Sequence, residues 1–160
     1  MAELHVCFVC TGNICRSPMA ALVFEEHLRR AGLDHRVRVT SAGIGSWHVG
    51  DRADSRALRT LSRAGYPTQH TAAQVGDPHL NADLLLAMDS GHEGALRDLL
   101  AHQGLDTEVR MFRSFDPHAN GDLDVPDPYY GRQEGFTEVL TMIEAAVPGL
   151  LEWVRDHLGR

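Results

Sequence analysis

The chain has 160 residues, 43% of them apolar and 23% charged, which is enough to bury one core, so we expect a single domain over residues 1–160. With 15 basic against 22 acidic side chains the formal charge is −7, which argues against nucleic acid or an anionic membrane as a partner. No apolar run reaches the roughly 20 residues of a membrane span, and Met1-Ala2-Glu3 lacks the basic flank of a signal peptide. We therefore expect a cytoplasmic protein, and export without a signal peptide stays open.

Apolar and β-branched runs alternate with helical periods along the chain. The expected strands cover residues 4–9, 37–42, 84–88 and 109–112. The expected helices cover residues 17–31, 54–64 and 91–103, and a last long helix follows an apolar stripe over residues 136–158. Ser17 is the expected N-cap of the first helix with Pro18 in its first turn, and Pro148 is expected to kink or break the last one.

This alternation predicts an α/β fold, a single-domain open four-stranded parallel sheet with helices on both faces. The second strand mixes β-branched residues with Arg38 and should lie nearer the sheet edge. The ligand crevice of such folds lies at the carboxyl ends of the strands, where the loop of residues 10–16 falls. The connection of residues 113–131 is long enough to be either functional or disordered.

The loop between the first strand and the first helix predicts a phosphate-binding site. Unpaired N–H groups of a curled loop and a helix start bind tetrahedral oxyanions, and Gly12 and Asn13 tolerate the positive φ of such a curl. Arg16 can hold two phosphate oxygens. The same groups stabilise a thiolate, so Cys10 would be a nucleophile beneath the phosphate, hydrogen-bonded by Ser17. The alternative is a small core cysteine and an ordinary helix-end arginine.

A thiolate that attacks a phosphate ester needs an acid to protonate the leaving oxygen. Asp127, between Pro126 and Pro128 in the long connection, is the candidate, although Asp-Pro also initiates turns. The adjacent Tyr129 and Tyr130 could form walls for a flat substrate group.

Through these motifs the chain resembles the low-molecular-weight protein tyrosine phosphatases. The likeness extends over essentially the whole length, from residues 9–18 through Thr40-Ser41-Ala42-Gly43 to Asp127-Pro128-Tyr129-Tyr130. It is nearest to actinobacterial members of the family through Trp47-His48-Val49-Gly50 and residues 113–117 and 148–150.

The resemblance implies hydrolysis of phosphotyrosine monoesters through a Cys10 phosphocysteine, with Arg16 as phosphate clamp and Asp127 as general acid and then base. The implied phosphate-binding loop comprises Thr11, Gly12, Asn13, Ile14, Cys15 and Ser17. Asn13, Ser17 and His70 would form its supporting network, although a buried, satisfied histidine is the alternative for His70. The implied pocket walls are Trp47, His48, Tyr129 and Tyr130.

The same resemblance implies phosphotyrosine-containing proteins as substrates and inorganic phosphate or vanadate as ligands of the site. It leaves open a kinase that acts on Tyr129 or Tyr130.

The three cysteines lie within nine residues of one another, which is no disulfide framework. Cys7 is expected in the core. For Cys15 we expect two roles together, a buried loop residue and a partner that forms a reversible disulfide with Cys10 on oxidation.

Three alternatives stay beside this interpretation. An arsenate reductase of the same fold needs further cysteines as a relay, and none follows Cys15; a protein arginine phosphatase of the family carries threonine where Ile14 stands. A non-catalytic phosphate-binding module would suit a chain that lacked Cys10, Arg16 or Asp127. The ten histidines show no metal-site spacing, so we expect neither metal nor cofactor.

Overall fold

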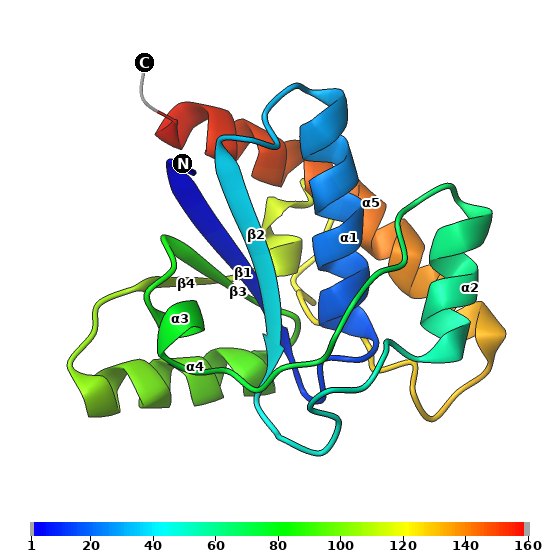
Figure 1. Ribbon diagram of the computed structural model, residues 1–160, viewed down its shortest axis with the longest axis horizontal. Helices are drawn as coiled ribbons and strands as arrows, with labels where there is room; N and C mark the ends of the chain where they lie inside the picture. Colours follow the sequence, from blue (N-terminus) through cyan, green and yellow to red (C-terminus); the bar gives the residue numbers. More distant parts are fainter. Residues whose placement is uncertain (1, 159–160) are drawn as a thin grey trace.

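The computed structural model describes residues 2–158 and contains one parallel sheet with helices on both faces (Figure 1). The strands are β1 (Leu4–Cys10), β2 (Val37–Gly43), β3 (Leu84–Ala87) and β4 (Glu108–Met111), in the order β2-β1-β3-β4. Every neighbouring pair is parallel. The expected α/β fold with four parallel strands is confirmed, and β2 lies at the sheet edge.

The helices are α1 (Arg16–Arg30), α2 (Ser55–Arg63), α3 (Asp77–Leu80), α4 (Ser90–Gln103) and α5 (Gln133–His157), with a short 3₁₀ helix η1 (Phe112–Phe115). Alternate side chains of β1 enter two separate cores, because successive residues of a strand point to opposite faces. Val6 and Phe8 pack with α1 and α5, whereas Cys7 and Val9 pack on the side of α3 and α4 (Figure 1). The carboxyl ends of the strands are thereby left open for a site.

The start of α1 differs from the expectation. Cys15 is the N-cap and Arg16 the first helical residue, so the assignment of Ser17 as N-cap is wrong. The Ser17 hydroxyl instead lies among polar groups of the preceding loop, where Asn13 Nδ2 donates to it. Pro18 is tolerated in the first turn because its missing N–H would have no helical partner there.

Pro148 does not break the last helix, since α5 is continuous from Gln133 to His157. A proline inside a helix costs about 3 kcal/mol. Burial of both Val147 and Leu150 beside Pro148 offsets that cost by packing. The short helix α3 was not expected, because four residues carry too little periodicity to be recognised. No helix in residues 2–158 is both long enough and apolar enough to cross a membrane.

Candidate active site

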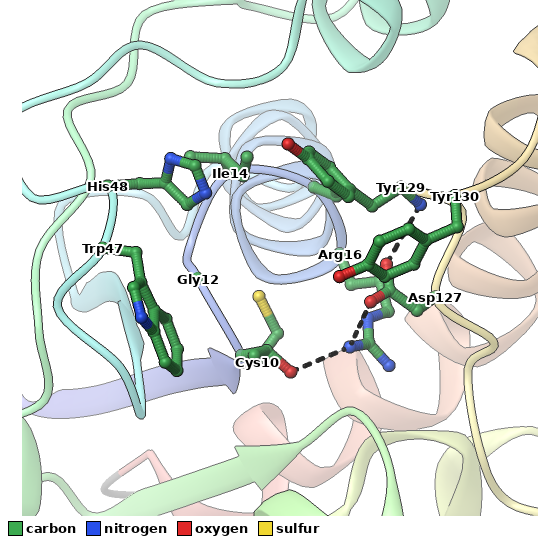
Figure 2. Close-up of a pocket in the computed structure, with 11 residues that line it drawn as sticks. Cys10, Gly12, Ile14, Arg16, Trp47, His48, Asp127, Tyr129 and Tyr130 are labelled. Atoms are coloured by element: carbon green, nitrogen blue, oxygen red, sulfur yellow. Dashed lines mark hydrogen bonds and ion pairs between the residues drawn. The ribbon is translucent and has the colours of Figure 1, made fainter.

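The loop between β1 and α1 forms the floor of a pocket of about 380 Å³ at the carboxyl end of the sheet (Figure 2). Residues far apart in the sequence meet here, because parallel strands end at one edge of the sheet. The pocket is lined by Cys10, Thr11, Gly12, Ile14, Cys15, Arg16, Trp47, His48, Asp127, Tyr129 and Tyr130.

Cys10 lies at the end of β1 and its thiol is buried at the pocket floor. Its Sγ is 2.9 Å from Ser17 Oγ. Because Asn13 Nδ2 donates to Ser17 Oγ at 2.8 Å, the Ser17 hydroxyl hydrogen is free to point at the sulfur. The N-terminus of α1 begins beside it, so the Ser17 hydroxyl and the positive end of the helix dipole both face Cys10 Sγ.

Asn13 shapes the loop. Within residues 2–158 it is the one non-glycine residue with positive φ, at 58°, and it is fully buried. Its Nδ2 donates to Ser17 and to Ser41 Oγ at 2.9 Å, and its Oδ1 accepts from the Ala73 N–H at 2.9 Å. His70 Nε2 donates to its backbone carbonyl at 2.7 Å, and burial lowers the pKa of His70, which favours the neutral ring. Asn13 is therefore tied to three separate segments of the chain, α1, β2 and the loop of residues 70–73.

Of the two residues that tolerate a positive φ, Asn13 adopts it and Gly12 does not. Its small size serves another purpose, because a Cβ there would lie 2.9 Å from Cδ2 of His48 in the pocket wall. Gly43, at the end of β2, likewise lets the loop approach: a Cβ there would lie 2.9 Å from the Thr11 carbonyl oxygen. The two glycines allow the phosphate loop to pack between β2 and the pocket wall.

Arg16 is buried and points into the pocket (Figure 2). Its Nη1 donates to Asp89 Oδ2 and to the Val125 carbonyl, both at 2.9 Å. Its Nη2 donates to Thr11 Oγ1 at 3.2 Å and lies 3.6 Å from Asp127 Oδ2. The guanidinium is thus held from three sides at the mouth of the phosphate loop.

Asp89 and His92 were missed by the sequence interpretation. Asp89 caps α4, and His92 is buried behind Thr11. His92 Nδ1 accepts the Asp89 N–H, which leaves the hydrogen on Nε2 to donate to Thr11 Oγ1 at 2.8 Å. Burial lowers the pKa of His92 to about 4, so the ring is neutral at pH 7. An aspartate that directly follows a strand and opens a helix was the available signal.

Asp127 lies over the pocket in the connection after η1, with its side chain partly exposed. Its Oδ1 accepts the Tyr129 N–H at 3.0 Å. Val125 anchors this connection, because its N–H donates to Met88 at 2.7 Å and its carbonyl accepts from Arg16. The expected long connection is therefore ordered over the site.

Aromatic side chains stand on both sides of the opening (Figure 2). Trp47 is 74% exposed and Tyr130 88% exposed, while the rings of His48 and Tyr129 lie 6.3 Å apart. Arg56 of α2, also missed from the sequence, donates to the Tyr129 carbonyl at 3.0 Å. These rings suit a flat group above the phosphate loop.

Cys7 and Cys15 are buried and reduced. Burial raises the pKa of both thiols, and the nearby Asp54 and Cys10 raise that of Cys15 further. Among residues 2–158 no cluster of three or more histidine, cysteine or acidic side chains could hold a metal ion.

Comparison with known proteins identifies the family. Residues 5–159 match the model for low molecular weight phosphotyrosine protein phosphatase. The chain is 57% identical over 158 residues to low molecular weight protein-tyrosine phosphatase A of Mycobacterium tuberculosis, covering 98% of this chain and 95% of that one.

Among solved structures, YfkJ from Bacillus subtilis covers 99% of both chains with a TM-score of 0.89 and 32% identity. A drosophila arginine phosphatase also matches, with a TM-score of 0.87, 26% identity and coverage of 94% of this chain and 97% of its own. The chain belongs to the low molecular weight phosphotyrosine protein phosphatase family and is a hydrolase.

Proposed function

We propose that this protein hydrolyses phosphotyrosine monoesters in protein substrates, with Cys10 as nucleophile and Asp127 as acid and base. The observation that carries the proposal is the order in which the functional groups lie from the floor of the pocket to its rim. Cys10 Sγ lies at the floor, the Arg16 guanidinium beside it, Asp127 above, and aromatic rings at the rim. The domain responsible extends over residues 1–160, and the proposed location is the cytoplasm.

In the first step the Cys10 thiolate attacks phosphorus, an S–P bond forms and the bond from phosphorus to the tyrosyl oxygen breaks. Asp127 gives its proton to that oxygen, so a neutral phenol leaves. Arg16 and the loop N–H groups neutralise the equatorial oxygens. In the second step Asp127 takes a proton from water, whose oxygen attacks phosphorus. The S–P bond breaks, phosphate departs, and Ser17 hydrogen-bonds the regenerated thiolate.

The remaining loop and wall residues have supporting roles in the proposal. Thr11, Gly12, Ile14 and Cys15 complete the loop that wraps the phosphate, and inorganic phosphate or vanadate would occupy the same position. Trp47, His48, Tyr129 and Tyr130 hold the phenyl ring. Tyr130, the most exposed of these, has the accessibility that a kinase substrate needs.

Cys15 is proposed to protect the site against oxidation. A peroxide converts the Cys10 thiolate to a sulfenic acid; the Cys15 thiol then displaces hydroxyl as water, and the disulfide forms. Burial and the neighbouring Cys10 both raise the pKa of the Cys15 thiol, so Cys15 stays protonated until the sulfenic acid forms. A thiol reductant then reduces the disulfide and restores both cysteines to their free form.

The arginine phosphatase alternative remains relevant because its fold is shared. What favours phosphotyrosine is the pocket itself, in which Ile14 and the paired tyrosines present apolar surface to a flat aromatic ring.

The test is hydrolysis, in chelator and reductant, of a phosphotyrosine peptide beside a phosphoarginine peptide, with vanadate as competitor. We expect vanadate-sensitive turnover of phosphotyrosine. Cys10→Ser should abolish turnover while it retains phosphate binding, and Asp127→Ala should slow activated aryl esters least. Turnover of phosphoarginine alone would show that Ile14 does not select as argued, and substantial activity of Cys10→Ser would remove the nucleophile assignment.

A further inference from the structure

We propose that a groove along α2, beside the active-site pocket, binds acidic residues that flank the phosphotyrosine of a substrate; this inference rests on the proposed function. The groove has a volume of about 390 Å³. It is lined by two arginines, Arg52 and Arg59, by three hydroxyl residues, Ser55, Ser62 and Thr68, and by the apolar Ala53 and Leu58.

Positive charge is concentrated at this place in an acidic chain. Four of the 15 basic residues, at positions 52, 56, 59 and 63, fall within one short segment of a protein with net charge −7. All are arginine, whose planar fork binds carboxylates through paired hydrogen bonds. Buried Ala57, Thr60 and Leu61 hold the other face of α2 against the core, so the arginines face outward.

The two arginines of the groove have no carboxylate partner among residues 2–158. Arg59 Nη1 donates to the neutral Gln133 amide at 3.1 Å, and neither Arg52 nor Arg59 forms an ion pair with any residue between positions 2 and 158. The nearby carboxylates are engaged elsewhere: Asp54 pairs with Arg56 at 2.8 Å, and Asp51 hydrogen-bonds His48 Nδ1 at 3.2 Å. Arg52 and Arg59 are therefore available to an external anion.

Three contacts join the groove to the active-site pocket. Asp54, next to the groove residue Ala53, donates its N–H to the carbonyl of Ile14 in the phosphate loop at 2.8 Å. Asp51, next to Arg52, hydrogen-bonds the wall residue His48. These contacts join residues next to the groove to the phosphate loop and to one wall of the pocket.

The third contact comes from the other side of α2. Arg56 donates to the Tyr129 carbonyl and lies 5.7 Å from its ring centre, so it connects α2 to the opposite pocket wall. Arg56 is occupied by this role, whereas Arg59, one turn further along, is exposed and donates only to the neutral Gln133 amide. A peptide whose phosphotyrosine enters the pocket between His48 and Tyr129 passes α2, where the hydroxyls and guanidinium groups can bind its carboxylates.

The experiment compares two phosphotyrosine peptides that differ only in flanking glutamates or glutamines, together with a small aryl phosphate. For the unaltered protein we expect a higher kcat/KM for the glutamate peptide, by about fivefold at low ionic strength, through a lower KM and with shrinkage at high salt. The variant Arg52→Gln with Arg59→Gln should lose this preference while it hydrolyses the aryl phosphate unchanged.

The matched control is Arg38→Gln with Arg155→Gln, which removes the same charge from β2 and from the far end of α5. This control should keep the glutamate preference, because only net charge has changed. Equal kcat/KM for both peptides in the unaltered protein, or equal loss in both double variants, would overturn the groove and leave the phosphatase activity standing. Failure to hydrolyse the aryl phosphate and both peptides would overturn the proposed function and the groove together.

Discussion

Asn13 shows how one side chain can specify a catalytic loop. A left-handed backbone costs an ordinary residue about 1–2 kcal/mol, and asparagine lowers that cost by local hydrogen bonding. Here both ends of its amide are used, on Ser17, Ser41 and the Ala73 backbone. The thiol environment of Cys10 therefore depends on a residue that does not line the pocket.

Substitutions at Asn13 should separate backbone strain from hydrogen bonding. Asn13→Gly keeps the accessible positive φ and loses the amide, whereas Asn13→Ala loses both. We expect a large drop in kcat in both variants and an additional loss of about 1–2 kcal/mol of unfolding free energy in Asn13→Ala. Urea unfolding and steady-state kinetics measure the two effects. Equal stability of the variants would contradict the assigned strain.

Thr11 offers a second test at the same scale. Its hydroxyl accepts from Arg16 and from the neutral His92, so Thr11→Val removes the oxygen that holds one side of the guanidinium. We expect kcat/KM to fall by about tenfold in Thr11→Val, because hydrogen bonds to charged groups are worth about 1.5–3 kcal/mol. Thr11→Ser restores the oxygen and should retain most activity; an equal loss in both would assign the effect to loop packing.

Local patterns explain which residues could be predicted from the sequence. Cys10, Arg16 and the loop between them are close in sequence, and the phosphate-binding arrangement follows from a strand, a short loop and a helix start. Asp89, His92 and Arg56 reach the site only through tertiary packing, 40 or more positions from the loop. The need for a small residue at Gly12 could not be predicted for the same reason, because it comes from the close approach of the His48 ring.

At the scale of elements, the sheet and its major helices were predictable because buried parallel strands are continuous apolar runs and the helices are periodic. The failures are at ends and breaks. Ser17 hydrogen-bonds within the loop and does not cap the helix, and α5 continues through Pro148, so of the kink or break predicted there the break is wrong. Both outcomes depend on tertiary contacts, which a local sequence pattern does not show.

At the scale of elements, we predict how a substitution of Gly149, the glycine after Pro148, changes stability. Gly149 lies where η1 crosses α5, and a Cβ there would stand 2.2 Å from the Phe115 carbonyl oxygen. Gly149→Ala must displace that backbone, so we expect a loss of about 1–3 kcal/mol of unfolding free energy by urea titration.

The control for this prediction is another helical glycine. Gly94, inside α4, would place a Cβ in open space, so Gly94→Ala should raise stability by about 0.5–1 kcal/mol through helix propensity. Similar effects of the two alanines would mean that η1 yields easily and that the close approach is unimportant.

The whole molecule carries one buried and four partly buried histidines that couple its stability to pH. Burial lowers the pKa of His5, His27, His70, His79 and His92 below the ordinary 6.5. Glu25, whose pKa burial raises, acts in the opposite direction. Because these histidines lie in β1, α1, α3, α4 and the segment after α2, on elements from both faces of the sheet, their effect belongs to global unfolding rather than to one site.

Between pH 6.5 and about 4, the lower limit that His92 sets, the unfolded chain binds more protons than the folded one. Stability is therefore fully present above pH 6.5 and falls as the pH decreases through this window. His92 alone contributes a slope of at most about 1.4 kcal/mol per pH unit. Urea unfolding at pH 7, 6 and 5 should show the decline. His92→Gln should flatten it, whereas His102→Gln, at the exposed end of α4, should not. A stability that stays constant or rises from pH 7 to pH 5 would show that these rings are protonated in the folded protein.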